Sequence, residues 1–223
     1  MAPGRPAPDA SSNPAGRSGP GRVDRAHPHR RGRRRLRQDV AYRWTLDADQ
    51  VLWLAVEVDP YGTWPCPLPR LGVGMTIPGE YDQVEWFGLG PGEAYRDTAN
   101  AARVGRYRAS VAEMQTPYVR PQENGNRRGV RWARLTDASG ATGLSLVAAP
   151  HLDLTAKPWS TAALDAAEHT HELRADGRIH LNLDHAHQGI GSAACGDPLP
   201  ESETLRAGHA EFRIGFLEIH QER

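Results

Sequence analysis

Apolar side chains recur at every second position along most of the chain from about residue 39 onward. Val, Tyr, Trp and Leu alternate with polar or small residues at 40–46, and the same period returns at 179–183 and 212–216. This alternation predicts strands that turn one face toward a core. Residues 51–58 are apolar on both faces, which predicts a strand that is buried on both sides.

Proline and glycine interrupt these segments at short intervals, and many short strands with such spacing are typical of a β-sandwich or β-barrel. The interruptions are Asp59-Pro60, 65–69, 88–92, Gly125, Gly140 and 189–196. One short helix is predicted over Thr161–Glu168, with Ser160 or Thr161 as its N-cap. The predicted fold class is all-β, and 223 residues suffice for one large domain or two small ones.

The net charge of zero hides two kinds of sequence. Residues 1–38 hold ten arginines, two aspartates and no aromatic residue, a net charge of +8, so the remainder carries −8. We expect 1–38 to be a disordered tail, because it cannot bury enough apolar surface to offset its ordering entropy. A nucleic-acid-binding arm at 30–35 is the alternative, but no aromatic side chain is present there to stack on bases. Codons upstream of the true start, or a shifted frame, would also produce such a tail.

Cysteine and hydropathy patterns restrict the cellular setting. Cys66 and Cys195 form no C-x-x-C pair and cannot build a disulfide framework, so a reducing cytoplasm is expected. No apolar run approaches the length of a membrane span, and the N-terminus has no apolar signal region. We therefore expect no membrane partner and, from the tail, no nucleic-acid partner.

Two stretches are specific enough to indicate a family. Residues 84–97 read VEWFGLGPGEAYRD, and residues 117–127 read PYVRPQENGNR, followed by VRW at 130–132. Together they resemble the last domain, or small chain, of bacterial glycoside hydrolase family 2 β-galactosidases. The resemblance covers residues 39–219, so 39–223 is interpreted as one such domain.

The resemblance implies a large antiparallel β-sandwich, similar to galactose mutarotases, with a concave side that faces carbohydrate. It also implies that the catalytic glutamates lie in a separate barrel, and that the family's magnesium and sodium sites lie mainly outside this domain. We therefore expect no catalytic residue, metal or cofactor in this chain. The family's opening strands should precede residue 39, and their loss would leave an unpaired sheet edge.

The glycine-rich segment at 88–93 is the first candidate site. In the resembled family this loop borders the active-site mouth of the neighbouring barrel. Three glycines permit positive φ angles and close approach to a ligand or another domain, although a plain strand connection is the alternative. The candidate residues here are Gly88, Leu89, Gly90, Pro91, Glu93 and the following Asp97. Ala94 and Arg96 depart from the family's usual Asn and Pro.

Two further segments complete the candidate site. Gln122, Glu123 and Asn124 are rich in donors and acceptors that suit sugar hydroxyl groups, but Asn124-Gly125 could equally supply the positive φ angles of a turn. In some family members a tryptophan that stacks on the sugar stands where this chain has Cys195 or Gly196.

The carboxylates, histidines and tryptophans of the chain also have simpler structural interpretations. A retaining glycosidase needs two carboxyl groups about 5–5.5 Å apart, and no spacing here dictates such a pair. His169 with His171, and His185 with His187, would each share a strand face, yet zinc needs three or four converging ligands. The remaining tryptophans with a possible sugar role are expected in the core. They are Trp86, Trp132 and Trp159.

Three functions are therefore considered. The first is a β-galactosidase fragment or small subunit that binds a β-galactoside and completes an active site held by a larger chain. The second is a free-standing aldose mutarotase, which needs a His acid and a Glu base at one sugar oxygen. The third is a non-catalytic carbohydrate-binding remnant. An oligomer is possible in each case.

Overall fold

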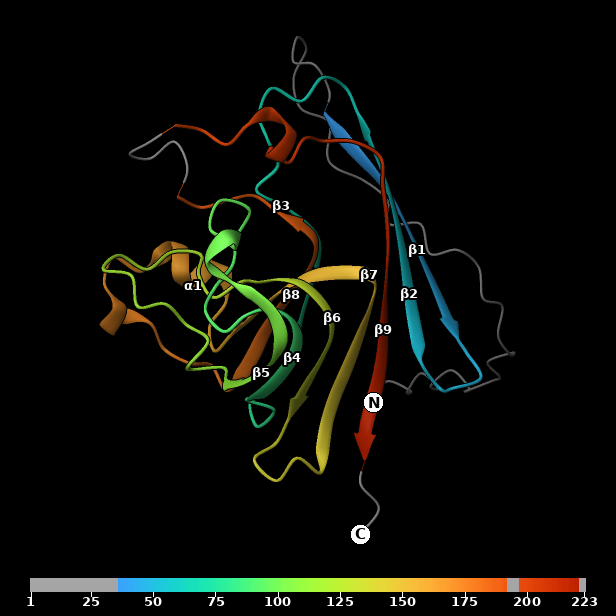
Figure 1. Cartoon of the computed structure of the whole chain (residues 1–223), viewed down its shortest axis with the longest axis vertical. Coiled ribbons are helices and arrows are strands. Elements are labelled where there is room, and N and C mark those ends of the chain that lie inside the picture. The colour runs from blue at the N-terminus through green and yellow to red at the C-terminus, as the bar shows by residue number, and fades with distance from the viewer. Residues whose placement is uncertain (1–35, 192–196, 221–223) are drawn as a thin grey trace, which may run out of the picture.

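The computed structural model describes residues 36–191 and 197–220, and antiparallel strands dominate it (Figure 1). This confirms the all-β prediction. The strands are β1 (Arg37–Leu46), β2 (Leu52–Tyr61), β3 (Arg70–Pro78), β4 (Gln83–Gly90), β5 (Arg103–Ser110), β6 (Arg127–Thr136), β7 (Thr142–Lys157), β8 (Arg178–His187) and β9 (Ala210–His220). The predicted helix is α1 (Thr161–Ala166), and three 3₁₀ turns lie at Ala99–Ala101, Thr170–Glu172 and Glu201–Glu203.

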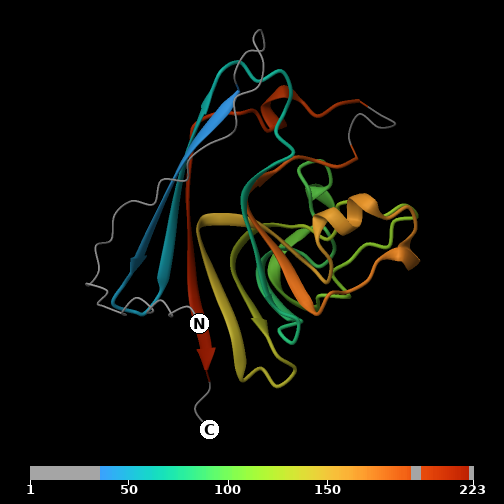
Figure 2. The ribbon, with the colours of Figure 1, turned by 180° about the vertical axis from the view of Figure 1, so that it is seen from behind.

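The long strand β7 divides the sheet into two halves. Its first part, 142–149, pairs with β9, and its last part, 153–157, pairs with β8. The order β1-β2-β9-β7-β6-β4-β5 forms one half, and β3 and β8 extend from the end of β7 to form the other. Figures 1 and 2 show the sharp bend of β7 and the two halves facing each other. The predicted antiparallel sandwich is thus formed by a sheet that folds back on itself.

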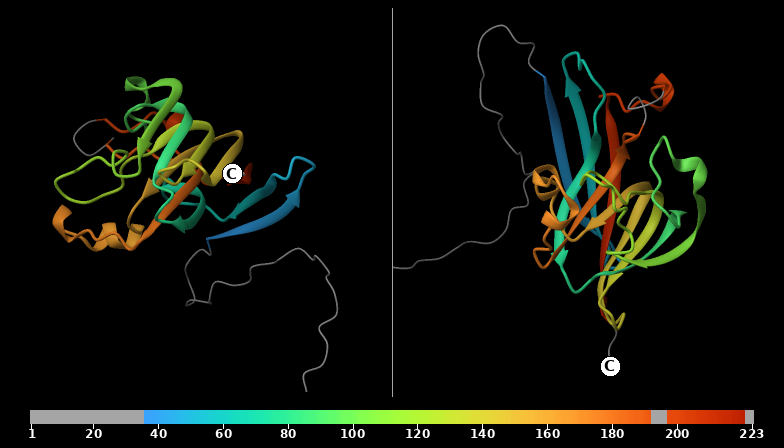
Figure 3. Two further views of the ribbon diagram at one scale, coloured as in Figure 1. Left: turned by 90° about the horizontal axis from the view of Figure 1, so that it is seen from below. Right: turned by 90° about the vertical axis from the view of Figure 1, so that its left-hand side faces the viewer.

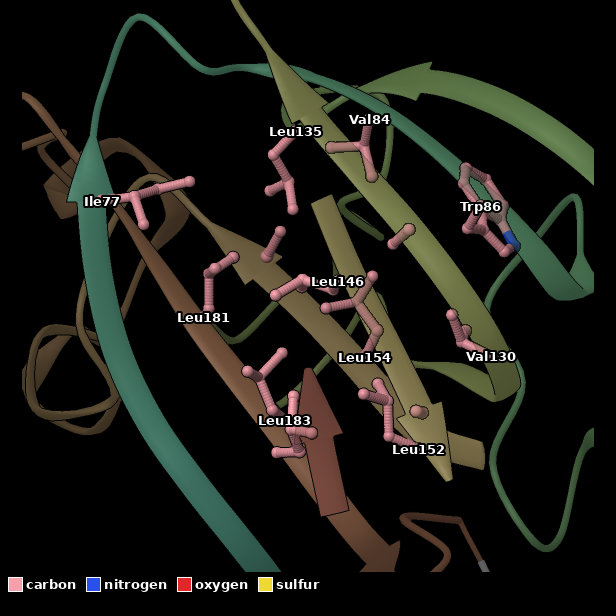
Figure 4. Close-up of a cluster of buried hydrophobic side chains, with 14 of the residues drawn as sticks. Ile77, Val84, Trp86, Val130, Leu135, Leu146, Leu152, Leu154, Leu181 and Leu183 are labelled. Carbon is pink, nitrogen blue, oxygen red and sulfur yellow. The ribbon is translucent and has the colours of Figure 1, made fainter. Parts of the chain in front are cut away.

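The core lies between these halves, where the predicted alternation places apolar side chains on both inner faces (Figure 4). One half contributes Val84, Trp86, Leu135 and Leu146, and the other contributes Ile77, Leu154, Leu181 and Leu183. Each of these side chains is less than a tenth exposed. Burial of one such side chain contributes about 1.5–3 kcal/mol to folding.

The first strand leaves this core uncovered. On β1, Val40, Tyr42, Trp44 and Leu46 are 36–61% exposed, although their partners at 54–58 on β2 include fully buried apolar side chains. The second half of the sheet does not reach over β1, and Figure 3 (left) shows β1 and β2 standing apart from it. Among the described residues β1 pairs with β2 alone.

The predicted tail at 1–38 ends too late, because Arg37 and Gln38 already belong to β1, and residues 1–35 lie outside the described part of the chain.

Two further expectations about local structure need correction. Strand β2 is buried on one face only, because Trp53 and Ala55 are half-buried and Glu57 is exposed on the other. Helix α1 ends at Ala166, two residues before the predicted end, although Ser160 does cap it by accepting a hydrogen bond from the Ala163 N–H at 3.1 Å. None of the described helices has the length and hydropathy that crossing a membrane requires.

The uncovered face of β1 predicts self-association of the isolated chain. Replacing both Tyr42 and Leu46 by Lys should reduce the light-scattering mass at a given concentration, because the added charges oppose strand-to-strand contact. Both side chains are exposed, so the free energy of unfolding should change by less than about 1 kcal/mol.

The control for this variant lies on the same strand. Ala41 and Thr45 point to the opposite face of β1 and are exposed. Replacing these two by Lys adds the same charge and should leave self-association unchanged. An equal reduction in both double variants would show that net charge, and not the apolar face, governs association.

Candidate functional site

The glycine segment at 88–93 is held close to the sheet. A Cβ atom on Gly88 would lie 2.9 Å from the Val130 Cα, and one on Gly90 would lie 2.7 Å from the Tyr107 ring. None of Gly88, Gly90 and Gly92 has a positive φ, so that part of the prediction is wrong. Close approach of neighbouring strands explains Gly88 and Gly90, whereas Gly92 has open space around it.

Glu93 joins this loop to the second motif. Its carboxylate accepts a hydrogen bond from the Gly125 N–H at 2.8 Å and another from the Tyr118 hydroxyl. Burial and this carboxylate raise the pKa of Tyr118 to about 12, so the phenol stays protonated and donates. The two motifs found in the sequence are therefore bound to each other at this point.

A backbone pairing beside Glu93 reinforces the join. The Ala94 N–H donates to the Asn126 carbonyl at 2.8 Å, and the Asn126 side-chain amide donates back to the Ala94 carbonyl at 2.7 Å. Asn126 is fully buried, so these bonds form away from water, where an unpaired amide would cost about 1–3 kcal/mol. The loop thus has a defined position before any ligand or partner binds.

Asp97 extends the same network to the third candidate segment. Its carboxylate accepts a hydrogen bond from the Gly191 N–H at 2.8 Å. Gly189 packs so closely that a Cβ atom there would lie 2.4 Å from the Asp97 Cγ. Cys195 and Gly196 lie outside the described residues, but the segment leading to them is fixed beside the glycine loop.

The segment around Asn124 is a turn. Gly125 has φ +76°, whereas Asn124 does not take a positive φ. The Asn124 amide donates to the Gln122 carbonyl at 3.0 Å, and its oxygen accepts the Thr116 N–H at 3.1 Å. Asn124 therefore stabilises a turn, as one of the two interpretations predicted. The side chain of Gln122 is exposed to solvent.

Glu123 takes part in a charged cluster that the sequence patterns did not reveal. Both of its carboxylate oxygens accept hydrogen bonds from the Lys157 ammonium, at 2.6 and 2.7 Å. Arg70 lies 3.5 Å from Glu123 and 3.0 Å from Asp184. The Lys157 side chain is 1% exposed and Asp184 is 2% exposed. Four alternating charges are thus gathered on the face of the β7–β8 pair opposite the core.

Burial shifts the protonation of this cluster. It raises the pKa of Asp184 to about 7 although the Arg70 guanidinium acts in the opposite direction, and it lowers the pKa of Lys157. The contact between Arg70 and Asp184 is an ion pair without aligned hydrogen-bond geometry, which leaves the desolvation of Asp184 only partly compensated. The signals in the sequence were the single lysine of the chain and an aspartate at 184 within an alternating strand.

His187, the last residue of β8, lies beside this cluster. Its ring is buried 5.2 Å from the Tyr95 ring, and its Nδ1 lies 2.5 Å from the Gln188 carbonyl oxygen. Burial lowers the pKa of His187 to about 4, so the imidazole is neutral at pH 7 and donates from Nδ1. This places His187 in a structural role within the candidate site.

The other candidate residues lie elsewhere or have other partners. His169 precedes the 3₁₀ turn at Thr170–Glu172 and His171 lies in it. The prediction that the two histidines share a strand face is therefore wrong. Trp86 is fully buried, whereas Trp132 and Trp159 are only half-buried, which corrects their expected core position. Glu85 lies in β4 and pairs with Arg106.

The sequence of this chain is also similar to known proteins. A sequence model of the family described as Beta galactosidase small chain matches residues 21–217. The chain belongs to the β-galactosidase small-chain family. The resemblance drawn from the two motifs is thereby confirmed.

Individual β-galactosidases show the same relationship. The β-galactosidase of Arthrobacter sp. strain B7 is 37% identical over 179 residues, which cover 74% of this chain and 17% of that enzyme. The β-galactosidase of Vibrio cholerae is 38% identical over 169 residues, and that of Priestia megaterium is 33% identical over 148. The chain spans only about one sixth of the length of the curated relatives it matches.

Removing the cation of the Lys157–Glu123 pair should destabilise the small-chain domain. Lys157→Met leaves Glu123 without its closest partner, and we expect the free energy of unfolding to fall by about 3 kcal/mol in urea titrations. The double variant Lys157→Met/Glu123→Gln should recover part of this loss, because it no longer carries the uncompensated carboxylate. A double variant that loses the full sum of both single effects would contradict the pairing.

Acid should destabilise the domain through His187. The folded pKa of about 4 lies below the usual 6.5, so the stability contributed by neutral His187 is present above pH 6.5 and is lost as pH falls toward 4. The limiting slope is about 1.4 kcal/mol per pH unit. His187→Gln should therefore lose less unfolding free energy than the unmodified chain between pH 7 and 4.5.

Asp184 makes the opposite contribution, because its raised pKa stabilises the folded state as pH falls. Comparing His187→Gln with the unmodified chain cancels this contribution. Both proteins retain Asp184, so only the difference between their two pH profiles is assigned to His187. Parallel profiles would show that His187 does not titrate with unfolding.

Proposed function

We propose that this chain is the C-terminal part of a β-galactosidase, which hydrolyses terminal β-galactosides such as lactose in the cytoplasm. In this proposal the chain forms part of the rim of an active site whose catalytic carboxylates belong to a larger chain or domain. The main support is that hydrogen bonds join three loops, at 88–97, 117–127 and 189–191. The chain also belongs to the small-chain family and spans only about one sixth of the length of its relatives.

The carboxylates of these loops support a positioning role. Glu93 accepts from Tyr118 and Gly125, Glu123 accepts from Lys157, and Asp97 accepts from Gly191. Each carboxylate thus binds donors of its own chain, so hydrolysis would need an acid and a nucleophile from elsewhere. The resemblance places the magnesium and sodium sites mainly outside this domain, so the proposed contribution involves no metal.

The remaining exposed groups supply contact with the partner. Pro91, Gly92 and Gln122 project at the tips of the joined loops. The uncovered apolar face of β1 gives a second surface for the larger chain, since burying these side chains would remove the exposed part of the core. A free-standing mutarotase is disfavoured, because His187 is buried and neutral and Glu123 is held by Lys157.

The test joins this chain to a catalytic part. The matching segment of the Arthrobacter sp. strain B7 enzyme is replaced by residues 39–217, and turnover of o-nitrophenyl β-galactoside is compared with that of the same enzyme without the segment. We expect the chimaera to hydrolyse the substrate, and the full 223-residue chain alone to show no turnover. Turnover by the chain alone, or an inactive folded chimaera, would overturn the proposal.

Within the chimaera, Asp97→Ala should lower kcat/KM by roughly tenfold to a hundredfold, because it frees the 189–191 segment from the glycine loop. Asp165→Ala is the matched control, since Asp165 is an exposed aspartate on α1. Thermal unfolding of both variants should change little. Equal activity of the two variants would show that the contact between these loops does not position the rim.

A further inference from the structure

A cavity of about 360 Å³ lies on the polar side of the second half of the sheet, away from the glycine loop. On β8 the buried Leu181 and Leu183 point into the core, so His180 and Asn182 project to the opposite face. Figure 2 shows α1 beside β8, and Thr161 at the start of α1 lines the cavity. The cavity is lined by Gly74, Met75, Thr76, Lys157, Trp159, Thr161, His180, Leu181 and Asn182.

Several polar groups at this cavity make no hydrogen bond to another described residue, and those of Thr76 and Thr161 are open to solvent and to a ligand. The Asn182 amide and the hydroxyls of Thr76 and Thr161 make no hydrogen bond to another described residue, whereas His180 contacts Asp176 at 2.9 Å. Unused donors and acceptors beside an aromatic ring are the groups with which pockets orient a polar ligand.

Trp159 supplies the apolar wall. It is half-buried at the edge of the cavity, and its indole N–H is buried without an acceptor among the described residues. Such a donor costs about 1–3 kcal/mol. A small rotation of the ring toward a ligand oxygen would remove this cost, while the ring face would pack against the ligand's C–H groups.

Gly74 lines the same cavity and pairs with Asn182 across β3 and β8. A Cβ atom there would lie 3.8 Å from the Asn182 Oδ1, which is ordinary van der Waals contact. The strand geometry therefore accepts a side chain at position 74, and the glycine leaves the cavity open. A larger side chain at this position would occupy it without straining the backbone.

The charge of the cavity restricts the ligand further. The Lys157 ammonium is 1% exposed, and both oxygens of Glu123 bind it, so its charge is already matched. The remaining unpaired groups are an amide, two hydroxyls and an indole, all of them neutral. This chemistry suits a neutral polyhydroxylated ring and gives no counter-charge for a phosphate or carboxylate.

We propose that this cavity is a second, non-catalytic binding site for one neutral pyranose unit. Trp159 contacts the ring face, and Asn182 with Thr76 binds the hydroxyl groups. The inference goes beyond the proposed function, because no group of the cavity takes part in the joined loops except Lys157, whose ammonium points to Glu123. The second binding site can therefore be tested independently of the proposed role in β-galactoside hydrolysis.

The test follows the six tryptophan indole N–H signals of the full chain by NMR, with the Trp159 signal identified from Trp159→Phe. Methyl β-D-galactopyranoside and methyl β-D-glucopyranoside are the probes, and galactose 6-phosphate is the charged comparator. We expect a saturable shift of the Trp159 signal with at least one of the neutral glycosides, and weaker binding of the phosphate.

Gly74→Leu fills the cavity and should weaken binding by at least about tenfold. Gly74→Ala, whose Cβ fits, should bind as the unmodified chain does. Circular dichroism verifies folding, and Thr76→Leu at an exposed position of β3 replaces Gly74→Leu if that variant unfolds.

Absence of a saturable shift with either glycoside would overturn the inference. Binding that Gly74→Leu or Thr76→Leu leaves unchanged would place the sugar elsewhere and would also overturn it. Tighter binding of galactose 6-phosphate would refute the assigned ligand class. The chimaera assay is independent of each result, so failure of one proposal is distinguishable from failure of the other.

Discussion

Burial of leucine side chains between the two halves of one folded sheet is the constraint on which the structure depends. Leu154 and Leu183 are fully buried at this interface, and they come from neighbouring strands of the same half. Their inward orientation fixes the opposite orientation of Thr155 and Asn182 by the period of a strand. The polar face of β7 and β8 is therefore a geometric consequence of the core.

That polar face explains why Lys157 and Asp184 are buried although both are charged residues. Lys157 and Asp184 occupy outward positions on β7 and β8, where Glu123 of the 117–127 loop contacts Lys157 and Arg70 contacts Asp184. Once buried, each charge requires an opposite charge or a shifted pKa, because water no longer solvates it. The Glu123 turn supplies the partner for Lys157, so the loop and the sheet stabilise each other.

Local patterns predicted much of this fold. Alternation located the strands at 179–183 and 212–216, because a strand with one buried face imposes that period on its sequence. It also located the strand at 40–46, although the apolar face of that strand is exposed. The predicted double burial of 51–58 failed because Trp53 and Ala55 have apolar side chains on a face that nothing covers fully. An apolar side chain in the sequence indicates a tendency to be buried. Whether another strand or loop covers that side chain depends on the tertiary structure.

The site was predictable as segments but not as contacts. The motifs at 84–97 and 117–127 marked two loops that prove to be hydrogen-bonded to each other, yet the bond between Glu93 and Gly125 joins residues 32 positions apart. Such pairs depend on the arrangement of whole strands. The glycines illustrate the same limit, since Gly88 and Gly90 are required by neighbouring strands and not by their own φ angles.

The position of β9 has a consequence for synthesis of the protein. This last described strand lies in the middle of the sheet, between β2 and β7, and among the described strands it is the one that pairs the β1–β2 hairpin with the rest of the sheet. A ribosome releases residues 210–220 after all the other described strands. The hairpin must then wait, without its β9 partner, until residues 210–220 have emerged, and its apolar face stays accessible to chaperones or to other nascent chains throughout that interval.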